Sequence, residues 1–119
     1  MINLSVFIRS ALLDLEIPIE SYDESSDVIS PFEFLADLMN DFVDTSRIDR
    51  LTKICSLVNE IYSNRENFNT DIENEIQILL FYNLEQTTLE TVKPLLLNDI
   101  VELGKEYLKN VQGDNFEDF

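Results

Sequence analysis

Carboxylates repeated at a spacing of four residues are the feature of this sequence that most directly suggests chemistry. Glu33, Asp37 and Asp41 follow one another at this spacing within a segment whose other residues are largely apolar. Residues four apart lie on the same side of a helix, so these three carboxylates would form an acidic line. Such a line concentrates negative charge and can steer a basic protein toward it.

The acidic line belongs to a longer run that has no basic residue. Between Arg9 and Arg47 the sequence contains neither lysine nor arginine. The acidic residues of this run are Asp14, Glu16, Glu20, Asp23, Glu24, Asp27, Glu33, Asp37, Asp41 and Asp44. A run of like charges is usually a solvated surface that keeps the protein soluble, and this remains the alternative interpretation.

The functional interpretation of the same run is a docking surface for a basic protein. It would combine the polar loop at 20–27 with the acidic line, and Tyr22 would be an aromatic anchor of the kind found at binding hot spots. The predicted partner-binding residues are Glu20, Tyr22, Asp23, Glu24, Asp27, Glu33, Asp37, Asp41 and Asp44.

Residues suited to acid–base or nucleophilic catalysis are scarce. The sequence has no histidine, which removes the commonest general base near neutral pH and the usual zinc and di-iron ligand sets. Cys55 lies between Leu51 and Val58 at helical spacing, so we predict a buried small side chain rather than a nucleophile. There is no glycine-rich phosphate loop. We therefore expect neither enzymatic activity nor a cofactor.

The segment Asp23–Asp27 is the best candidate for a metal site, because its side chains are rich in the oxygen atoms that calcium prefers. It lacks the ligand spacing and the glycine of an EF-hand loop. Carboxylates cluster easily in so acidic a sequence, and we predict no metal site.

The overall charge limits the class of partner. The chain has 24 acidic and 8 basic residues and a formal net charge of −16. Nucleic acid and anionic membranes would both be repelled, so we expect neither as a partner. The longest apolar run, Ile78–Tyr82, is far too short to span a bilayer, and Met1–Arg9 does not have the pattern of a signal peptide. A single cysteine fits a reducing compartment, and we expect the cytoplasm.

The elements that must position these side chains are helices. Apolar residues recur at intervals of three and four, and only two glycines and three prolines are present among 119 residues. We predict an all-α, single-domain bundle at 1–111, followed by an acidic tail at 112–119. The five expected helices are at about 3–15, 31–43, 46–63, 71–85 and 94–110.

Local signals set the expected helix boundaries. Capping residues predict the N-termini of the middle helices, and the expected N-caps are Ser30, Thr45 or Ser46, and Thr70. Pro94 is expected to begin the last helix rather than to kink a longer one. Gly104 falls inside that helix, where glycine costs about 1 kcal/mol relative to alanine, and it indicates a close contact between helices.

The segment 73–85 is expected to be the central helix of the bundle. It is apolar on every side between Ile78 and Tyr82, and a helix that is apolar all round is normally buried all round. We therefore expect its residues to form the core and not to contact a partner.

An acidic, histidine-free, all-helical chain of this size resembles the small immunity proteins that bacteria produce against their own toxic nucleases and pore formers. The likeness covers the whole chain and rests on size, acidity and helical layout. The segment Ile78–Glu85 also looks like the central helix of small bacterial helical domains of unknown function. The resemblance implies inhibition by occlusion, with the acidic surface covering the nucleic-acid-binding cleft of a basic toxin.

The sequence is therefore compatible with two functions. The first is an immunity or inhibitor protein that binds a basic toxin domain. The alternative is a generic helical adaptor or homodimeric assembly protein, associating through an apolar surface such as Leu89, Val92 and Leu95.

Overall fold

The computed structural model describes residues 1–17 and 30–112, and this part of the chain contains six α-helices and no β-strand. The helices are α1 (Leu4–Asp14), α2 (Pro31–Asp44), α3 (Ile48–Ser63), α4 (Ile72–Glu75), α5 (Gln86–Val92) and α6 (Asn98–Gln112). The only extended pairing in the described residues is a single bridge between Ile2 and Phe68. The prediction of an all-α fold is confirmed.

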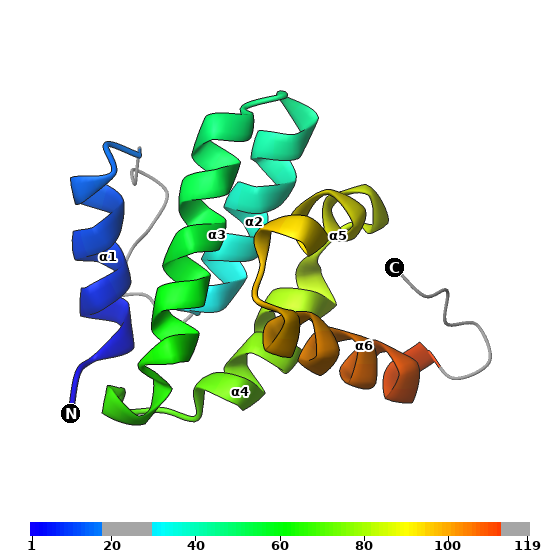
Figure 1. Cartoon of the computed structure of the whole chain (residues 1–119). Coiled ribbons are helices and arrows are strands. Elements are labelled where there is room, and N and C mark those ends of the chain that lie inside the picture. The colour runs from blue at the N-terminus through cyan, green and yellow to red at the C-terminus, as the bar shows by residue number, and fades with distance from the viewer. Residues whose placement is uncertain (18–29, 113–119) are drawn as a thin grey trace.

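The helices surround one apolar core. In Figure 1, α1, α3 and α2 lie side by side, and the chain then crosses beneath them through α4 before it returns through α5 and α6. The largest fully buried side chains come from α1, α2, α3, α4 and the segment after α4. Within residues 1–17 and 30–112, no helix is both long enough and apolar enough to cross a membrane.

The N-terminus of α2 was predicted correctly. The Ser30 side chain accepts a hydrogen bond from the Glu33 amide at 3.2 Å, and Pro31 is the first helical residue, where its missing N–H has no cost. This cap fixes where α2 begins, and hence which of its residues point to solvent.

The predicted cap of the third helix is wrong. α3 begins at Ile48 after Arg47, and neither Thr45 nor Ser46 caps it. The Thr45 hydroxyl instead donates to the Asp41 carbonyl at 2.8 Å, at the end of α2. Ser46 has a φ of 58°, and the Arg47 amide donates to the Phe42 carbonyl at 2.8 Å, so these residues close the C-terminus of α2 and α3 starts two residues later than expected.

The central segment is only partly the helix that we predicted. After the short helix α4, the residues Ile76–Leu80 form a π-turn and Phe81–Asn83 form a 3₁₀ turn, so a regular helix over 71–85 is wrong beyond Glu75. The N-cap is Asp71, which accepts from the Asn74 amide at 3.2 Å, and not Thr70. The central position is correct, because the segment packs against both α2 and α6.

Burial of this segment on all sides is also wrong. Ile76, Leu80 and Phe81 are buried, but Ile78 is 44% exposed and Tyr82 is 64% exposed. α2 covers one side of the segment and α6 another, and these two residues lie on the side that neither helix covers. The apolar residues on every side of this segment therefore predicted more covering helices than the fold provides.

The last helix begins later than predicted. Pro94 lies in a 3₁₀ turn, Lys93–Leu95, and α6 starts at Asn98. Asn59 of α3 holds this break, because its side chain donates to the Leu95 carbonyl at 3.0 Å and accepts from the Leu97 amide at 2.9 Å.

The surface proposed for a homodimer is not available. Leu89 is 4% exposed and Val92 is fully buried, because α5 packs these residues against the core. Leu95 is only partly buried. A homodimer, if formed, would have to use another surface.

Candidate protein-binding surface

The acidic line lies on the solvent side of α2, as the spacing predicted. Asp37 and Asp41 are exposed and Glu33 is half-buried, and the exposed Asp44 extends the line to the end of α2. The opposite side of the helix enters the core through Phe32, Phe34, Leu35, Ala36, Met39 and Phe42. α2 therefore presents its carboxylates as a consequence of burying its apolar side.

The structure places four of the nine predicted partner-binding residues. Glu20, Tyr22, Asp23, Glu24 and Asp27 lie outside the described residues, as does the candidate calcium segment at 23–27. Within residues 1–17 and 30–112, no group of three or more histidine, cysteine, aspartate or glutamate side chains is placed to hold a metal ion.

The surroundings of Asp37, in the middle of the acidic line, shift the pKa of its carboxyl group. The packed helix removes part of the hydration of the Asp37 carboxyl group, although this side chain is exposed, and this desolvation, and secondly the neighbouring carboxylate of Glu33, raise the pKa of Asp37 above its ordinary value of 3.8. Both effects disfavour the ionised form. A cation that docks between these two carboxylates would relieve part of this cost.

Positive charge meets the acidic line at its C-terminal end. The turn after α2 brings Arg47 and Arg50 to the start of α3, and the Arg50 guanidinium lies 5.9 Å from the ring centre of Phe42. The base-free run in the sequence is therefore adjacent to basic residues in space near Asp44. The part of α2 toward Glu33 and Asp37 is farther along the helix from them.

The connection between α2 and the turn that follows the central segment was not predicted. Asn40 lies on α2 between Asp37 and Asp41, and its side-chain nitrogen donates to the Asn83 carbonyl at 2.9 Å. Its side-chain oxygen accepts from the Glu85 amide at 3.0 Å. The polar side of α2 therefore continues onto the segment that contains Tyr82. In the sequence, only Asn40, a single asparagine beside the apolar stripe of α2, could have indicated this connection.

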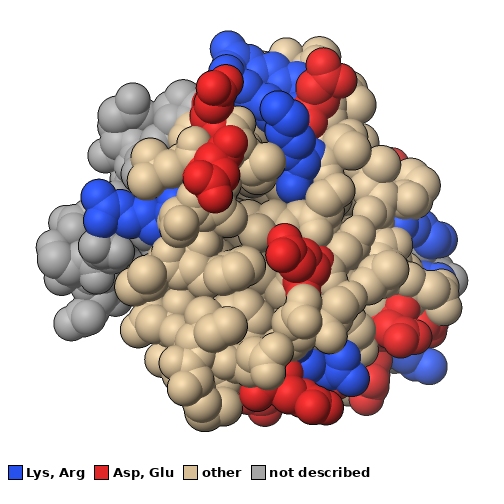
Figure 2. Space-filling model, turned by 60° about the vertical axis from the view of Figure 1, so that its left-hand side comes forward, with Lys and Arg blue, Asp and Glu red and all other residues tan. Residues whose placement is uncertain are grey.

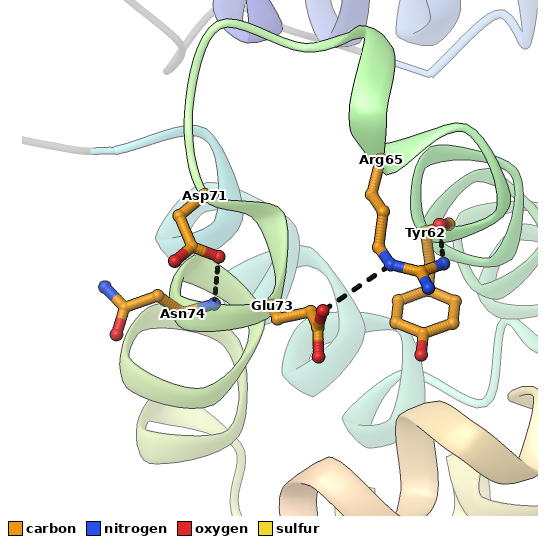
Figure 3. A network of polar contacts seen from close by, with 5 residues as sticks. All are labelled: Tyr62, Arg65, Asp71, Glu73 and Asn74. Atoms are coloured by element: carbon orange, nitrogen blue, oxygen red, sulfur yellow. Dashed lines mark hydrogen bonds and ion pairs between the residues drawn. The ribbon is translucent and has the colours of Figure 1, made fainter.

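A second group of polar contacts lies at the corner between α3 and α4 and has a structural role (Figure 3). The Arg65 guanidinium stacks over the ring of Tyr62 at 4.4 Å, donates to the Tyr62 carbonyl at 3.1 Å and pairs with Glu73 at 3.5 Å. These contacts tie the corner to both helices that it joins.

The side of the molecule that carries α1 differs from the acidic line. Figure 2 shows basic and acidic side chains interspersed on this side, with most of the visible surface uncharged. A groove of about 230 Å³ lies here between α1 and α3, lined by Ala11, Asp14, Leu15, Lys53, Ser56, Leu57 and Glu60. Its charges have both signs, so it does not favour a partner of one charge.

Cys55 is fully buried in the core, as predicted, and burial raises the pKa of its thiol to about 12. The reactive thiolate is therefore disfavoured at physiological pH.

Comparisons of the chain with protein-family models, with curated proteins and with solved structures gave no match.

Proposed function

We propose that this chain is a protein-binding module that docks a basic protein partner on the acidic line of α2. The observation that carries the proposal is the common exposure of Asp37, Asp41 and Asp44 on a helix within a run that contains no lysine or arginine. Complementary charge accelerates association and suppresses wrong partners more than it increases affinity.

Within that class we propose an immunity or inhibitor protein that occludes a basic toxin domain, such as a nuclease. An enzyme that binds nucleic acid must present a basic cleft, because it has to neutralise phosphate charge. A rigid acidic helix can occupy such a cleft as a substitute for the nucleic acid. The proposal gives the chain no catalytic step and requires no cofactor, and it is supported by the resemblance in size, acidity and helical layout.

Charge reversal on two different helices tests the proposal. One variant combines Asp37→Lys, Asp41→Lys and Asp44→Lys on α2, and the matched control combines Asp99→Lys, Glu102→Lys and Glu106→Lys on α6. All six side chains are exposed, and both variants change the net charge by the same amount. The immobilised proteins would be exposed to lysate of the source cells, and bound protein would be released with salt and assayed for nuclease activity.

We expect wild type and the α6 variant to retain a basic protein with nuclease activity, and the α2 variant to lose it. Release should become easier as ionic strength rises, because salt screens exposed charges. Equal retention by both variants would show that the acidic line is not the docking surface. A retained basic protein without nuclease activity would leave the docking surface intact and overturn the assignment to nuclease inhibition.

A further inference from the structure

A second run without basic residues lies later in the chain. Between Arg65 and Lys93 there is neither lysine nor arginine. The acidic residues in this interval are Glu66, Asp71, Glu73, Glu75, Glu85 and Glu90. This interval contains the central segment and α5, and it is separated in sequence from the run that contains α2.

The fold packs these two base-free runs against each other. α2 contacts the π-turn Ile76–Leu80, the 3₁₀ turn Phe81–Asn83 and α5. The two hydrogen bonds of Asn40, to the Asn83 carbonyl and from the Glu85 amide, lie on this contact. In Figure 1, α2 and the segments around α5 are accordingly neighbours. Asn40 is three residues after Asp37 and four before Asp44, so the turn that contains Tyr82 lies beside the side of α2 that carries these two carboxylates.

Two apolar side chains of the central segment are exposed to solvent. Ile78 and Tyr82 are 44% and 64% exposed, and they lie about one turn apart. A side chain of that size gains free energy when it leaves water, and tyrosine is enriched at binding hot spots. Ile78 lies in the π-turn Ile76–Leu80, a local irregularity of a kind found frequently at functional sites, and Tyr82 lies in the 3₁₀ turn that follows it.

We infer that Tyr82, with Ile78 beside it, is the apolar anchor of the docking surface and that its ring takes an arginine side chain of the basic partner. The inference rests on the proposed function and adds to it a residue and a recognition chemistry. A guanidinium over an aromatic ring is attracted by the negative face of the ring. The same chain already shows this pairing, because Arg65 lies 4.4 Å from the ring centre of Tyr62.

Charge distinguishes a basic partner from the other occupants of such a surface. A second copy of this chain would bring a net charge of −16 to a surface built from two base-free runs, and the two would repel. Nucleic acid and anionic lipid would be repelled for the same reason. An arginine-rich protein segment supplies both the opposite charge and a planar group that stacks on tyrosine.

Two short fluorescent peptides of equal charge test the inference, one alternating arginine with glycine and the other alternating lysine with glycine. Their affinities for the full chain would be measured by fluorescence anisotropy at low ionic strength, where surface charge is least screened. The variants are Tyr82→Ala, Tyr82→Phe, the α2 charge reversal, and Val111→Ala as an exposed apolar control on α6. Circular dichroism would show that each variant is folded.

We expect the wild-type chain to bind the arginine peptide more tightly than the lysine peptide. Tyr82→Ala should weaken binding of the arginine peptide by about two- to fivefold and remove the preference, because an exposed cation–π contact is lost. Tyr82→Phe keeps the ring and should keep the preference, and Val111→Ala should match wild type.

The failures of the two proposals are distinguishable. If the α2 reversal weakens both peptides, and either Tyr82→Ala behaves as wild type or wild type shows no preference for arginine, the anchor is wrong and the acidic docking surface stands. If the α2 reversal changes neither affinity, or if neither peptide binds to wild type, the acidic docking surface is wrong and the anchor falls with it.

Discussion

Gly104 of α6 lies directly against the ring of Phe81, so closely that a Cβ atom on residue 104 would overlap the ring. Phe81 is 1% exposed, so its ring is enclosed by the core. Beside this contact, the Gln77 side chain donates to the Leu103 carbonyl at 3.1 Å. The absence of a side chain at Gly104 therefore sets how closely α6 approaches the central segment, and it confirms the close helix contact that this glycine predicted.

Gly104→Ala should destabilise the protein, although alanine is the better helix former. Helix propensity favours alanine by about 1 kcal/mol, but forcing an extra methyl group into a packed core typically costs about 1–3 kcal/mol. We expect urea unfolding to show a net loss of about 1 kcal/mol or more, and no loss for Asn110→Ala on the exposed side of the same helix. In a Phe81→Leu background the loss should shrink, because the ring is gone. An unchanged or increased stability of Gly104→Ala would contradict the contact.

The extent to which the fold followed from the sequence varies along the chain. α1 and α2 agree with the predicted ranges to within a residue at each end, because an amphipathic stripe and a capping residue coincide there. The segment after Asp71 was predicted less well. The π-turn and the 3₁₀ turn there are set by how α2 and α6 pack on the segment, and periodicity along one helix contains no information about its neighbours.

Asn40→Ala should weaken the contact between α2 and the turn after the central segment. The Asn83 carbonyl and the Glu85 amide would lose their partner, and the partly buried Asn83 bond accounts for most of the expected cost of about 1 kcal/mol. Asn40→Asp should cost at least as much at neutral pH, because a carboxylate cannot donate to the Asn83 carbonyl. Hydrogen exchange of the Glu85 amide should accelerate in both variants. Protection of that amide equal to wild type would exclude the proposed role of Asn40.

Arg65 should contribute to stability through Tyr62 rather than through Glu73. The ion pair joins side chains that are 39% and 51% exposed, and exposed pairs contribute about 0–1 kcal/mol. The stack on Tyr62 and the bond to its carbonyl together should contribute about 1–2 kcal/mol. We therefore expect Arg65→Ala to lower the unfolding free energy more than Glu73→Ala does. Arg65→Lys should recover little, because lysine does not reproduce the planar stack. Equal losses for Arg65→Ala and Glu73→Ala would assign the effect to the ion pair.

Cys55 should react with a thiol reagent only when the protein unfolds. Burial raises the pKa of the thiol to about 12 and also blocks access to it. In the folded protein at mildly alkaline pH we expect the reaction with a chromogenic disulfide to follow the unfolding rate. Denaturant should make it fast. Rapid labelling of the native protein would show that the core opens around α3.

The candidate site was predictable where it depended on one helix and not where it depended on two. The spacing of Glu33, Asp37 and Asp41 was sufficient to place an acidic line on the outside of α2. The exposure of Tyr82 was not predictable, because a tyrosine within an apolar run looks like a core residue until the covering helices are placed. The proximity of two base-free runs likewise depends on tertiary packing.

Asp37→Asn should stabilise the protein at neutral pH and not in acid. Partial desolvation first, and the charge of Glu33 second, raise the pKa of Asp37 in the folded state, so the folded state binds this proton more tightly than the unfolded state does. The stabilisation due to that proton is fully present below the ordinary value of 3.8 and is lost as pH rises through the folded pKa. At neutral pH the ionised group therefore opposes folding. Because Asp37 is exposed, we expect a gain of only about 0.2–0.5 kcal/mol for Asp37→Asn, the size of a like-charge pair four residues apart on a helix.

The measurement for Asp37 is urea unfolding of wild type and Asp37→Asn at neutral pH and again at a pH below 3.8. Glu106→Gln on α6 is the control, since it removes one exposed negative charge from a different helix. If Asp37→Asn and Glu106→Gln give the same gain, the effect comes from the net charge of the chain. If the gain of Asp37→Asn persists unchanged in acid, the ionisation of Asp37 is not its cause. A gain seen only at neutral pH and only for Asp37→Asn would show that the ionised Asp37 is a source of unfavourable charge within the acidic line. Asp37 is part of the surface on which we propose that a basic partner docks.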